Sequence, residues 1–91
     1  MRYEWNEAKR RTNLRKHGLD FPDAPPVFEG ATVTVLDDRR AYGEERFITL
    51  GLLQTTVVVI SHTENVDVIR VISMRKATRH EEESYFEEIA N

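Results

Sequence analysis

The stretch RFITLGLLQTTVVVISHTENVDVIRVISM, residues 46–74, decides the fold class. It holds three runs rich in β-branched and aliphatic residues, which are typical of strands. The runs cover residues 46–53, 57–63 and 66–74. The connections between them are short, and this predicts an antiparallel meander. Residues 31–36 alternate in polarity before a charged loop, so we expect them to form one more strand of the same sheet.

Helices are expected on both sides of this region. Asn6 is a good N-cap for a helix over residues 7–17, and Gly18 is a typical residue just past a helix end. Residues 78–81, Thr-Arg-His-Glu, match a capping box that opens a last helix, which runs to about residue 89. The apolar residues of this last helix are expected to dock on the sheet: Tyr85, Phe86 and Ile89.

The segment before the sheet is harder to interpret. Residues 20–24 predict the start of a second short helix with Pro22 in its first turn. Pro25 and Pro26 argue against a long extension of it. Residues 3–5 are a candidate short first strand. The sequence therefore predicts an α+β fold, with N-terminal helices, an antiparallel meander sheet of about four strands and a C-terminal helix.

Length and composition set the class of protein. The 91 residues are enough for one domain, 1–91, and 40% of them are hydrophobic, which indicates a folded chain. There is no cysteine, so disulfides and thiolate metal sites are excluded. The longest apolar run is residues 57–60, far too short to cross a membrane, and residues 1–6 lack the apolar core of a signal peptide. We therefore expect a cytoplasmic protein without contact to a membrane.

The net charge of −3 hides a segregation of charges along the chain. Basic residues gather in two groups, one early and one late, and the C-terminal segment is acidic. The groups are Lys9, Arg10, Arg11, Arg15 and Lys16, and then Arg70, Arg75, Lys76 and Arg79. Such groups are either solvated helix faces or patches that bind phosphate.

No metal-binding or phosphate-loop motif accompanies these charges. The three histidines lie in different predicted elements without ligand-like spacing, and the four glycines are isolated. Cationic groups, histidines and glutamates are sufficient for RNA cleavage without a metal ion or cofactor. The 2′-hydroxyl of the RNA is then the nucleophile, and the protein must move protons and stabilise charge on phosphorus.

His17 and Lys16 are candidates for this chemistry at the end of the first predicted helix. The helix dipole favours cations there, so capping alone accounts for both residues. In the functional interpretation, Lys16 binds phosphate and His17 transfers a proton near neutral pH.

Arg70 is a candidate because it interrupts an apolar strand. Strict alternation over residues 66–74 places Arg70 on one face with Val68, Ile72 and Met74. An arginine there is costly unless it is paired or serves a site. A structural ion pair with a glutamate such as Glu44 is the alternative to a phosphate-binding role.

Three further cations complete the candidate set. Arg46 opens its strand after two glutamates, and it is either an edge residue or a phosphate ligand. Arg75 and Lys76 are expected between the last strand and the last helix, where an anion could meet the helix N-terminus. A solvated turn is the alternative for that pair.

Several segments together resemble the signature of the BrnT toxin family. They are residues 4–9, residues 13–18, Phe21 with residues 24–28, residues 43–47 with Gly51, and residues 69–78 with Glu81 and Tyr85. They keep the family order and span nearly the whole chain. Pro25 and Pro26 depart from the family pattern, which puts the second helix in doubt but leaves the site intact.

The resemblance implies a fold similar to RelE toxins and a ribonuclease that lowers translation. It implies a BrnA-type antitoxin as partner, whose ribbon-helix-helix end binds operator DNA, with two toxins on an antitoxin dimer that represses its own promoter. The family's positively charged positions map here onto Lys16, His17, Arg46, Arg70, Arg75 and Lys76. The alternatives are a non-catalytic binding module and an inactive toxin that acts only as a co-repressor.

Overall fold

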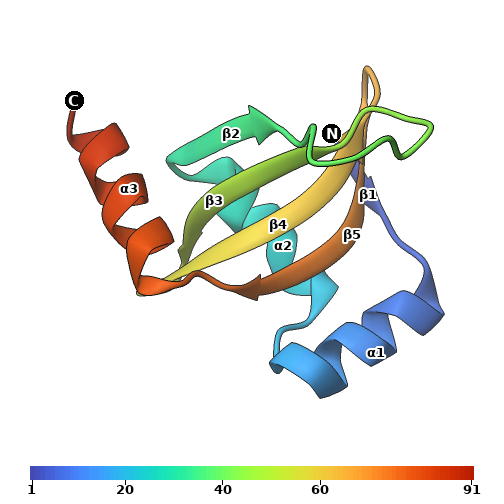
Figure 1. Ribbon diagram of the computed structural model, residues 1–91. Helices are drawn as coiled ribbons and strands as arrows, with labels where there is room; N and C mark the ends of the chain where they lie inside the picture. The colour runs from blue at the N-terminus through green and yellow to red at the C-terminus, as the bar shows by residue number, and fades with distance from the viewer.

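The computed structural model describes residues 1–91 as one five-stranded sheet with three α-helices (Figure 1). The order of the strands across the sheet is β1-β5-β4-β3-β2. The elements are β1 (Arg2–Glu4), α1 (Glu7–His17), the 3-10 helix η1 (Phe21–Asp23), α2 (Ala24–Glu29), β2 (Thr32–Leu36), β3 (Phe47–Leu53), β4 (Thr56–Glu64), β5 (Val68–Lys76) and α3 (Arg79–Ala90). The α+β class expected from the sequence is therefore confirmed.

The expected meander is present in β2 to β5, where each strand pairs antiparallel with the next. The expectation of a purely antiparallel sheet of about four strands is wrong, because β1 adds a fifth strand parallel to β5. Arg2 pairs with Val68 and Glu4 pairs with Arg70. A strand of three residues is too short to show an alternation pattern, and its partner lies near the other end of the chain.

A β-bulge in β5 decides which side chains share a face of the sheet. The pairing with β4 shifts between Ser61 and His62, which leaves Ile72 as the extra residue in β5. The alternation restarts there, so Met74 points into the core while Arg70 points to the opposite face. The expectation that Arg70 and Met74 share one face of the sheet is therefore wrong.

The helix α1 is capped as predicted at both ends. The Asn6 side chain accepts a hydrogen bond from the Lys9 backbone N–H at 3.0 Å. Gly18 has φ of 71°, the left-handed conformation that favours glycine, and its N–H donates to the Leu14 carbonyl at 2.9 Å. These caps fix the point at which the chain leaves the helix, just after His17.

A single buried side chain joins α1 to the sheet. Asn13, the one buried residue of this helix, donates to the Met74 carbonyl at 2.8 Å and accepts from the Met74 N–H at 3.0 Å. It also donates to the Leu19 carbonyl at 3.1 Å. β1 pairs with β5 only as far as Arg70, so Met74 lies on a free edge of the sheet. There Asn13 forms the two hydrogen bonds that a neighbouring strand would form.

The short helix α2 forms despite its prolines. Pro25 and Pro26 lie in its first turn, where backbone N–H groups have no partner within the helix. Proline is therefore tolerated there, and the doubt raised by this pair does not hold. The preceding η1 likewise has Pro22 in its first turn, as expected.

The core lies between one face of the sheet and the segment η1–α2. We call this the covered face, and the opposite one the open face. Eight buried residues form the core: Phe21, Ala24, Val27, Val58, Ile60, Ile69, Val71 and Met74. In Figure 1, α2 lies behind the sheet and α3 stands beside one end of it.

The close approach of α2 to β3 requires a glycine at position 51. A Cβ atom there would lie 2.7 Å from Val27 Cγ1 and 3.2 Å from Thr32 Cγ2. We expect Gly51→Ala to lower the free energy of unfolding by about 1–3 kcal/mol, measured by urea denaturation, because overpacking forces side chains or backbone to shift. Gly30→Ala is the control, since its nearest contact would be an ordinary 3.6 Å, and it should change stability by less than about 0.5 kcal/mol. Equal stability of both variants would contradict the tight contact.

The last helix docks less completely than expected. Its capping box is confirmed, with Thr78 and Glu81 each bonded to the other's backbone N–H. Tyr85 is buried, but Phe86 and Ile89 remain 44% and 41% exposed, so the expected docking is wrong for these two. Successive helix residues are about 100° apart, so Phe86 cannot face the same surface as Tyr85. Ile89 lies in the last turn of the helix.

Candidate functional site

Three of the predicted site residues emerge on the open face of the sheet. Arg75 pairs with Val59 and Arg70 with Thr63, and both partners alternate with buried residues of the covered face. Arg46 directly precedes Phe47, which pairs with the buried His62, so Arg46 also belongs to the open face. The five residues from Arg70 to Arg75 separate their side chains by roughly 15 Å along the strand. The open face therefore carries one arginine pair and, further along β5, a single arginine.

Arg46 and Arg70 meet at one carboxylate. An Nη2 atom of Arg70 donates to Glu44 Oε2 at 2.7 Å, and Arg46 Nη2 lies 3.6 Å from the same oxygen. The side chains of Arg70 and Glu44 are about four-tenths exposed. The ion pair with Glu44 that the sequence offered as an alternative is therefore present. It does not exclude a site, because the same contact brings two guanidiniums together at an accessible carboxylate.

Arg46 is held from its other side by an aromatic ring. Its guanidinium carbon lies 4.2 Å from the centre of the Tyr42 ring, within the range of a cation–π interaction. Its Nε is buried without a hydrogen-bond partner. Tyr42 and Glu44 therefore hold the Arg46 guanidinium from two sides.

The loop between β2 and β3 is ordered by a buried acid that sequence reasoning missed. Asp37 is 2% exposed and accepts two hydrogen bonds from the Arg39 guanidinium, at 2.8 and 2.9 Å. It also accepts one from the Tyr42 hydroxyl at 3.0 Å. The Arg39 contact holds the pKa of Asp37 well below its usual range, so this carboxylate stays ionised. The sequence indicates only a charged loop here. A loop has no periodic pattern, so nothing in the sequence shows which of its acids is buried.

Arg75 and Lys76 are the last residues of β5, so the expectation that they lie in a turn before α3 is wrong. The Arg75 guanidinium instead donates two hydrogen bonds to Glu81 in the first turn of α3, at 2.8 and 2.9 Å. This interaction lowers the pKa of Glu81 to about 2. It also raises the pKa of Arg75, an effect opposed by burial and, to a smaller extent, by the charge of Arg39. The guanidinium of Arg75 is therefore bound to a carboxylate that stays ionised.

Lys16 and His17 lie exposed at the end of α1. They follow Asn13 by three and four residues, so they lie on the same side of the helix as the residue that touches Met74. Met74 directly precedes Arg75 and Lys76. Among the predicted site residues, the structure therefore joins only Arg46 and Arg70, through Glu44. Arg75 and Lys76 are neighbours at the end of β5 and point to opposite faces of the sheet, while Lys16 and His17 lie on the helix whose Asn13 contacts Met74.

His62 is a buried histidine of the covered face. Its Nε2 lies 2.7 Å from Thr49 Oγ1, and its ring packs against Phe28 and Phe47. Burial lowers the pKa of His62, and the carboxylate of Glu64, 3.7 Å from Nδ1, opposes this shift. His62 is therefore neutral at neutral pH, and its contacts are those of a core residue.

The buried His62 predicts a pH dependence of stability. Because its pKa is lower in the folded chain than the ordinary value near 6.5, unfolded chains bind more protons as the pH falls below 6.5. The free energy of unfolding should be highest above pH 6.5 and fall between pH 6.5 and 5, before the carboxylates titrate. Urea denaturation across this range should show the fall in the wild type and a weaker one in His62→Gln. An equal fall in both would assign the effect to another group.

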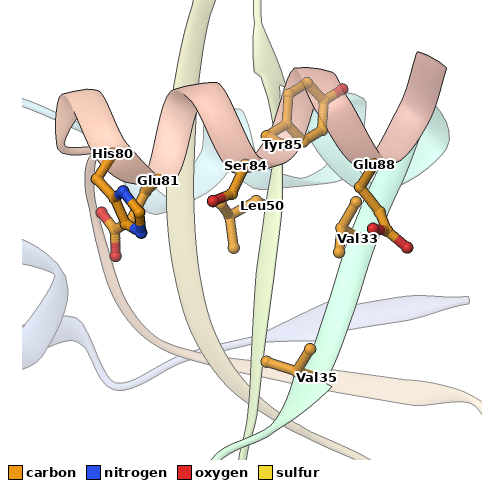
Figure 2. A pocket seen from close by; sticks show the side chains of 8 residues that line it. All are labelled: Val33, Val35, Leu50, His80, Glu81, Ser84, Tyr85 and Glu88. Atoms are coloured by element: carbon orange, nitrogen blue, oxygen red, sulfur yellow. The ribbon is translucent and has the colours of Figure 1, made fainter. Parts of the chain in front are cut away.

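A groove beside α3 is less suited to binding phosphate than the arginine pair. A groove of about 270 Å³ lies between α3 and the sheet, with apolar strand residues opposite polar helix residues (Figure 2). Its lining is Val33, Val35, Leu50, His80, Glu81, Ser84, Tyr85 and Glu88. This groove is part of the open face, because Leu50 pairs with Val59, the cross-strand partner of Arg75. It contains no arginine or lysine and two glutamates, so Arg46 and Arg70, which lie outside it, are the better candidate for binding an anion.

Fold and site together define a small α+β protein with arginines on the sheet face opposite the core, a face that α3 covers in part. The chain belongs to the BrnT family: a family model described as the ribonuclease toxin, BrnT, of type II toxin–antitoxin systems matches residues 5–81. The resemblance found in the sequence is therefore confirmed, and this family implies an antitoxin partner. A search of curated proteins found no match.

The three α-helices of the structure were also compared with the requirements of a membrane span. None of them is both long enough and apolar enough to cross a membrane.

Proposed function

We propose that this protein is a metal-independent endoribonuclease that cleaves cytoplasmic RNA and thereby lowers translation. The observation that carries the proposal is the meeting of two guanidiniums, those of Arg46 and Arg70, at the accessible carboxylate of Glu44. Guanidinium groups bind two phosphate oxygens in a planar fork and remain charged at every physiological pH. A pair of them supplies the positive charge that a metal ion would otherwise bring to the phosphorane.

The chemistry assigned to the pair is internal transfer of the phosphodiester. The RNA 2′-oxygen attacks phosphorus, and its proton passes to a base on the protein. The bond from phosphorus to the 5′-oxygen breaks as that oxygen takes a proton from an acid on the protein or from water, which leaves a 2′,3′-cyclic phosphate and a 5′-hydroxyl. Arg46 and Arg70 stabilise the charge on the non-bridging oxygens. Glu44 lies where it can accept the 2′-hydroxyl proton once phosphate has drawn the guanidiniums away from it.

The other predicted cations are proposed to bind RNA further along β5. Arg75, Lys16 and Lys76 would contact phosphates that flank the cleaved one, in the way that basic grooves track a single strand. His17 remains our sequence-based proposal for proton transfer. It competes with Glu44 for this role, and only a comparison of variants separates the two.

The proposed partner is a BrnA-type antitoxin of the ribbon-helix-helix class. Two toxins are proposed to bind one antitoxin dimer, and the complex to repress its own promoter through the antitoxin's contact with operator DNA. Support comes from the family assignment, which places the chain in a type II toxin–antitoxin system. Light scattering on the purified complex, together with operator binding, tests this arrangement.

The test of function is expression of the chain alone and with its antitoxin, while growth and RNA integrity are followed. We expect growth arrest with RNA loss, rescued by the antitoxin and reduced in His17→Ala, Arg70→Ala and Arg75→Ala at equal protein level. Cleavage by the purified protein should persist in EDTA, and its loss there would contradict metal independence.

An inactive toxin that acts as a co-repressor is the second candidate. It is favoured by one observation: each open-face arginine of the predicted site already contacts a glutamate. Normal growth and intact RNA, with soluble wild-type protein that still binds operator DNA with its antitoxin, would support this candidate.

A further inference from the structure

The loop between β2 and β3 forms a hollow lined by arginines, next to the Arg46 and Arg70 pair. Arg39, Arg40 and Tyr42 line a cavity of about 300 Å³. We propose that this cavity binds one nucleotide of single-stranded RNA, adjacent to the nucleotide at Arg46 and Arg70. Its phosphate contacts Arg39 and Arg40. Its base packs against the Tyr42 ring in the place that the Arg40 guanidinium, 5.4 Å from the ring centre, leaves when it turns to the phosphate. This inference rests on the proposed ribonuclease function and names a binding subsite for its substrate.

The hollow is preorganised rather than formed by free surface side chains. Asp37 is buried and fixes Arg39 through two hydrogen bonds and Tyr42 through one. The backbone N–H of Arg39 also donates to Asp37, at 3.3 Å. The loop therefore holds a guanidinium and an aromatic ring in fixed positions around one ionised acid, and binding requires less ordering of side chains.

Two guanidiniums of the hollow have free capacity for an anion. Arg39 uses Nε and Nη2 to bind Asp37, which leaves Nη1 without a partner. Arg40 forms no ion pair and lies 5.4 Å from the centre of the Tyr42 ring. In this respect Arg40 differs from Arg46, Arg70 and Arg75, each of which contacts a glutamate.

The hollow adjoins the proposed cleavage site through a shared side chain. The Tyr42 ring that lines the cavity also packs against the Arg46 guanidinium, 4.2 Å from the ring centre. A strand with one phosphate at Arg46 and Arg70 therefore passes the cavity with its neighbouring nucleotide. Aromatic rings beside arginines are a common platform for unstacked RNA bases.

Acidic residues in the loop limit the kind of ligand that binds. Asp37, Asp38, Glu44 and Glu45 outnumber the arginines of residues 37–46, so the loop has no excess of positive charge. Attraction by net charge is therefore weak, and binding must come from oriented guanidiniums and stacking. The ligand that uses both is a nucleotide, not a free inorganic anion.

The test uses fluorescein-labelled 2′-O-methyl oligouridylates of two and four nucleotides, which cannot be cleaved because the 2′-oxygen is blocked. Binding to the full chain is measured by fluorescence anisotropy at several salt concentrations. We expect the wild type to bind the tetramer at least about tenfold more tightly than the dimer. Arg40→Gln should remove most of this advantage, leave dimer binding unchanged, and lower the salt slope for the tetramer by about 0.7.

Two further variants separate this inference from the function on which it rests. Arg70→Ala should weaken binding of both oligonucleotides, and Arg79→Gln, which alters an arginine that is 92% exposed on α3, should weaken neither. If Arg40→Gln binds the tetramer as the wild type does while Arg70→Ala weakens both, the subsite is overturned and the cleavage site stands. If the wild type binds neither oligonucleotide, the RNA-binding role of the open face is overturned together with the subsite.

Discussion

Arg70→Ala is expected to cleave RNA about a hundredfold or more slowly than the wild-type protein, as measured by single-turnover rates with purified chains. Arg70 presents a partly exposed guanidinium on β5, a strand paired on both sides at this position, and it lies 2.7 Å from Glu44. Loss of one preorganised charge-stabilising donor typically lowers kcat by about 100- to 1000-fold. Arg70→Lys keeps the charge but not the planar fork, and it should recover only part of the rate.

The control for this variant is Arg79→Ala, because that arginine is exposed on α3 and pairs only with Glu83 on the same helix. Its rate should equal that of the wild type. An unchanged rate in Arg70→Ala would contradict the proposed site and move the chemistry toward Arg75. Glu44→Gln then distinguishes the two roles of the carboxylate. The rate falls if Glu44 accepts the proton, and it is unchanged or higher if Glu44 only neutralises the arginines.

The meander was predictable because its strands pair with their neighbours in sequence. Short connections and β-branched runs over β3, β4 and β5 leave few other arrangements. The candidate strand at residues 3–5 is present as β1, shifted by one residue. Its parallel pairing with β5 was not predictable, since the two strands lie near opposite ends of the chain. The bulge at Ile72 was also not predictable, because the assignment of side chains to faces by alternation assumes that no bulge interrupts the strand.

The candidate site was predictable in its residue types but not in its grouping. Arg70 stood out as a charge in an apolar run and Arg46 as a cation at the start of a strand, and the structure joins them through Glu44. The organising role of Asp37 was not visible, because burial of a loop acid depends on tertiary contacts that no local pattern encodes. The β-strand position of Arg75 was missed because Arg75 and Lys76 resemble a polar turn before a capped helix.

Asn13 was missed because its burial, like that of Asp37, depends on tertiary contacts. Its substitution should have the largest effect on stability. Asn13 is the only buried residue of a very polar helix, and its amide forms three hydrogen bonds that replace a missing strand at the edge of β5. Asn13→Leu leaves the N–H and carbonyl of Met74 without partners, and each buried group left so costs about 1–3 kcal/mol. We expect the free energy of unfolding to fall by about 3 kcal/mol, out of about 5–14 kcal/mol for a chain of this length.

Thermal denaturation followed by circular dichroism measures this effect, and a loss of about 3 kcal/mol should lower Tm by roughly 15 °C. Lys9→Leu is the matched control, because it adds the same side chain at an exposed position of α1 and should change stability by less than about 0.5 kcal/mol. Since α1 also carries Lys16 and His17, a destabilised Asn13→Leu chain should lose their contribution to RNA binding before it unfolds globally. A variant with wild-type Tm would show that α1 is held to the sheet by other contacts, and the position of Lys16 and His17 beside β5 would then lose its structural basis.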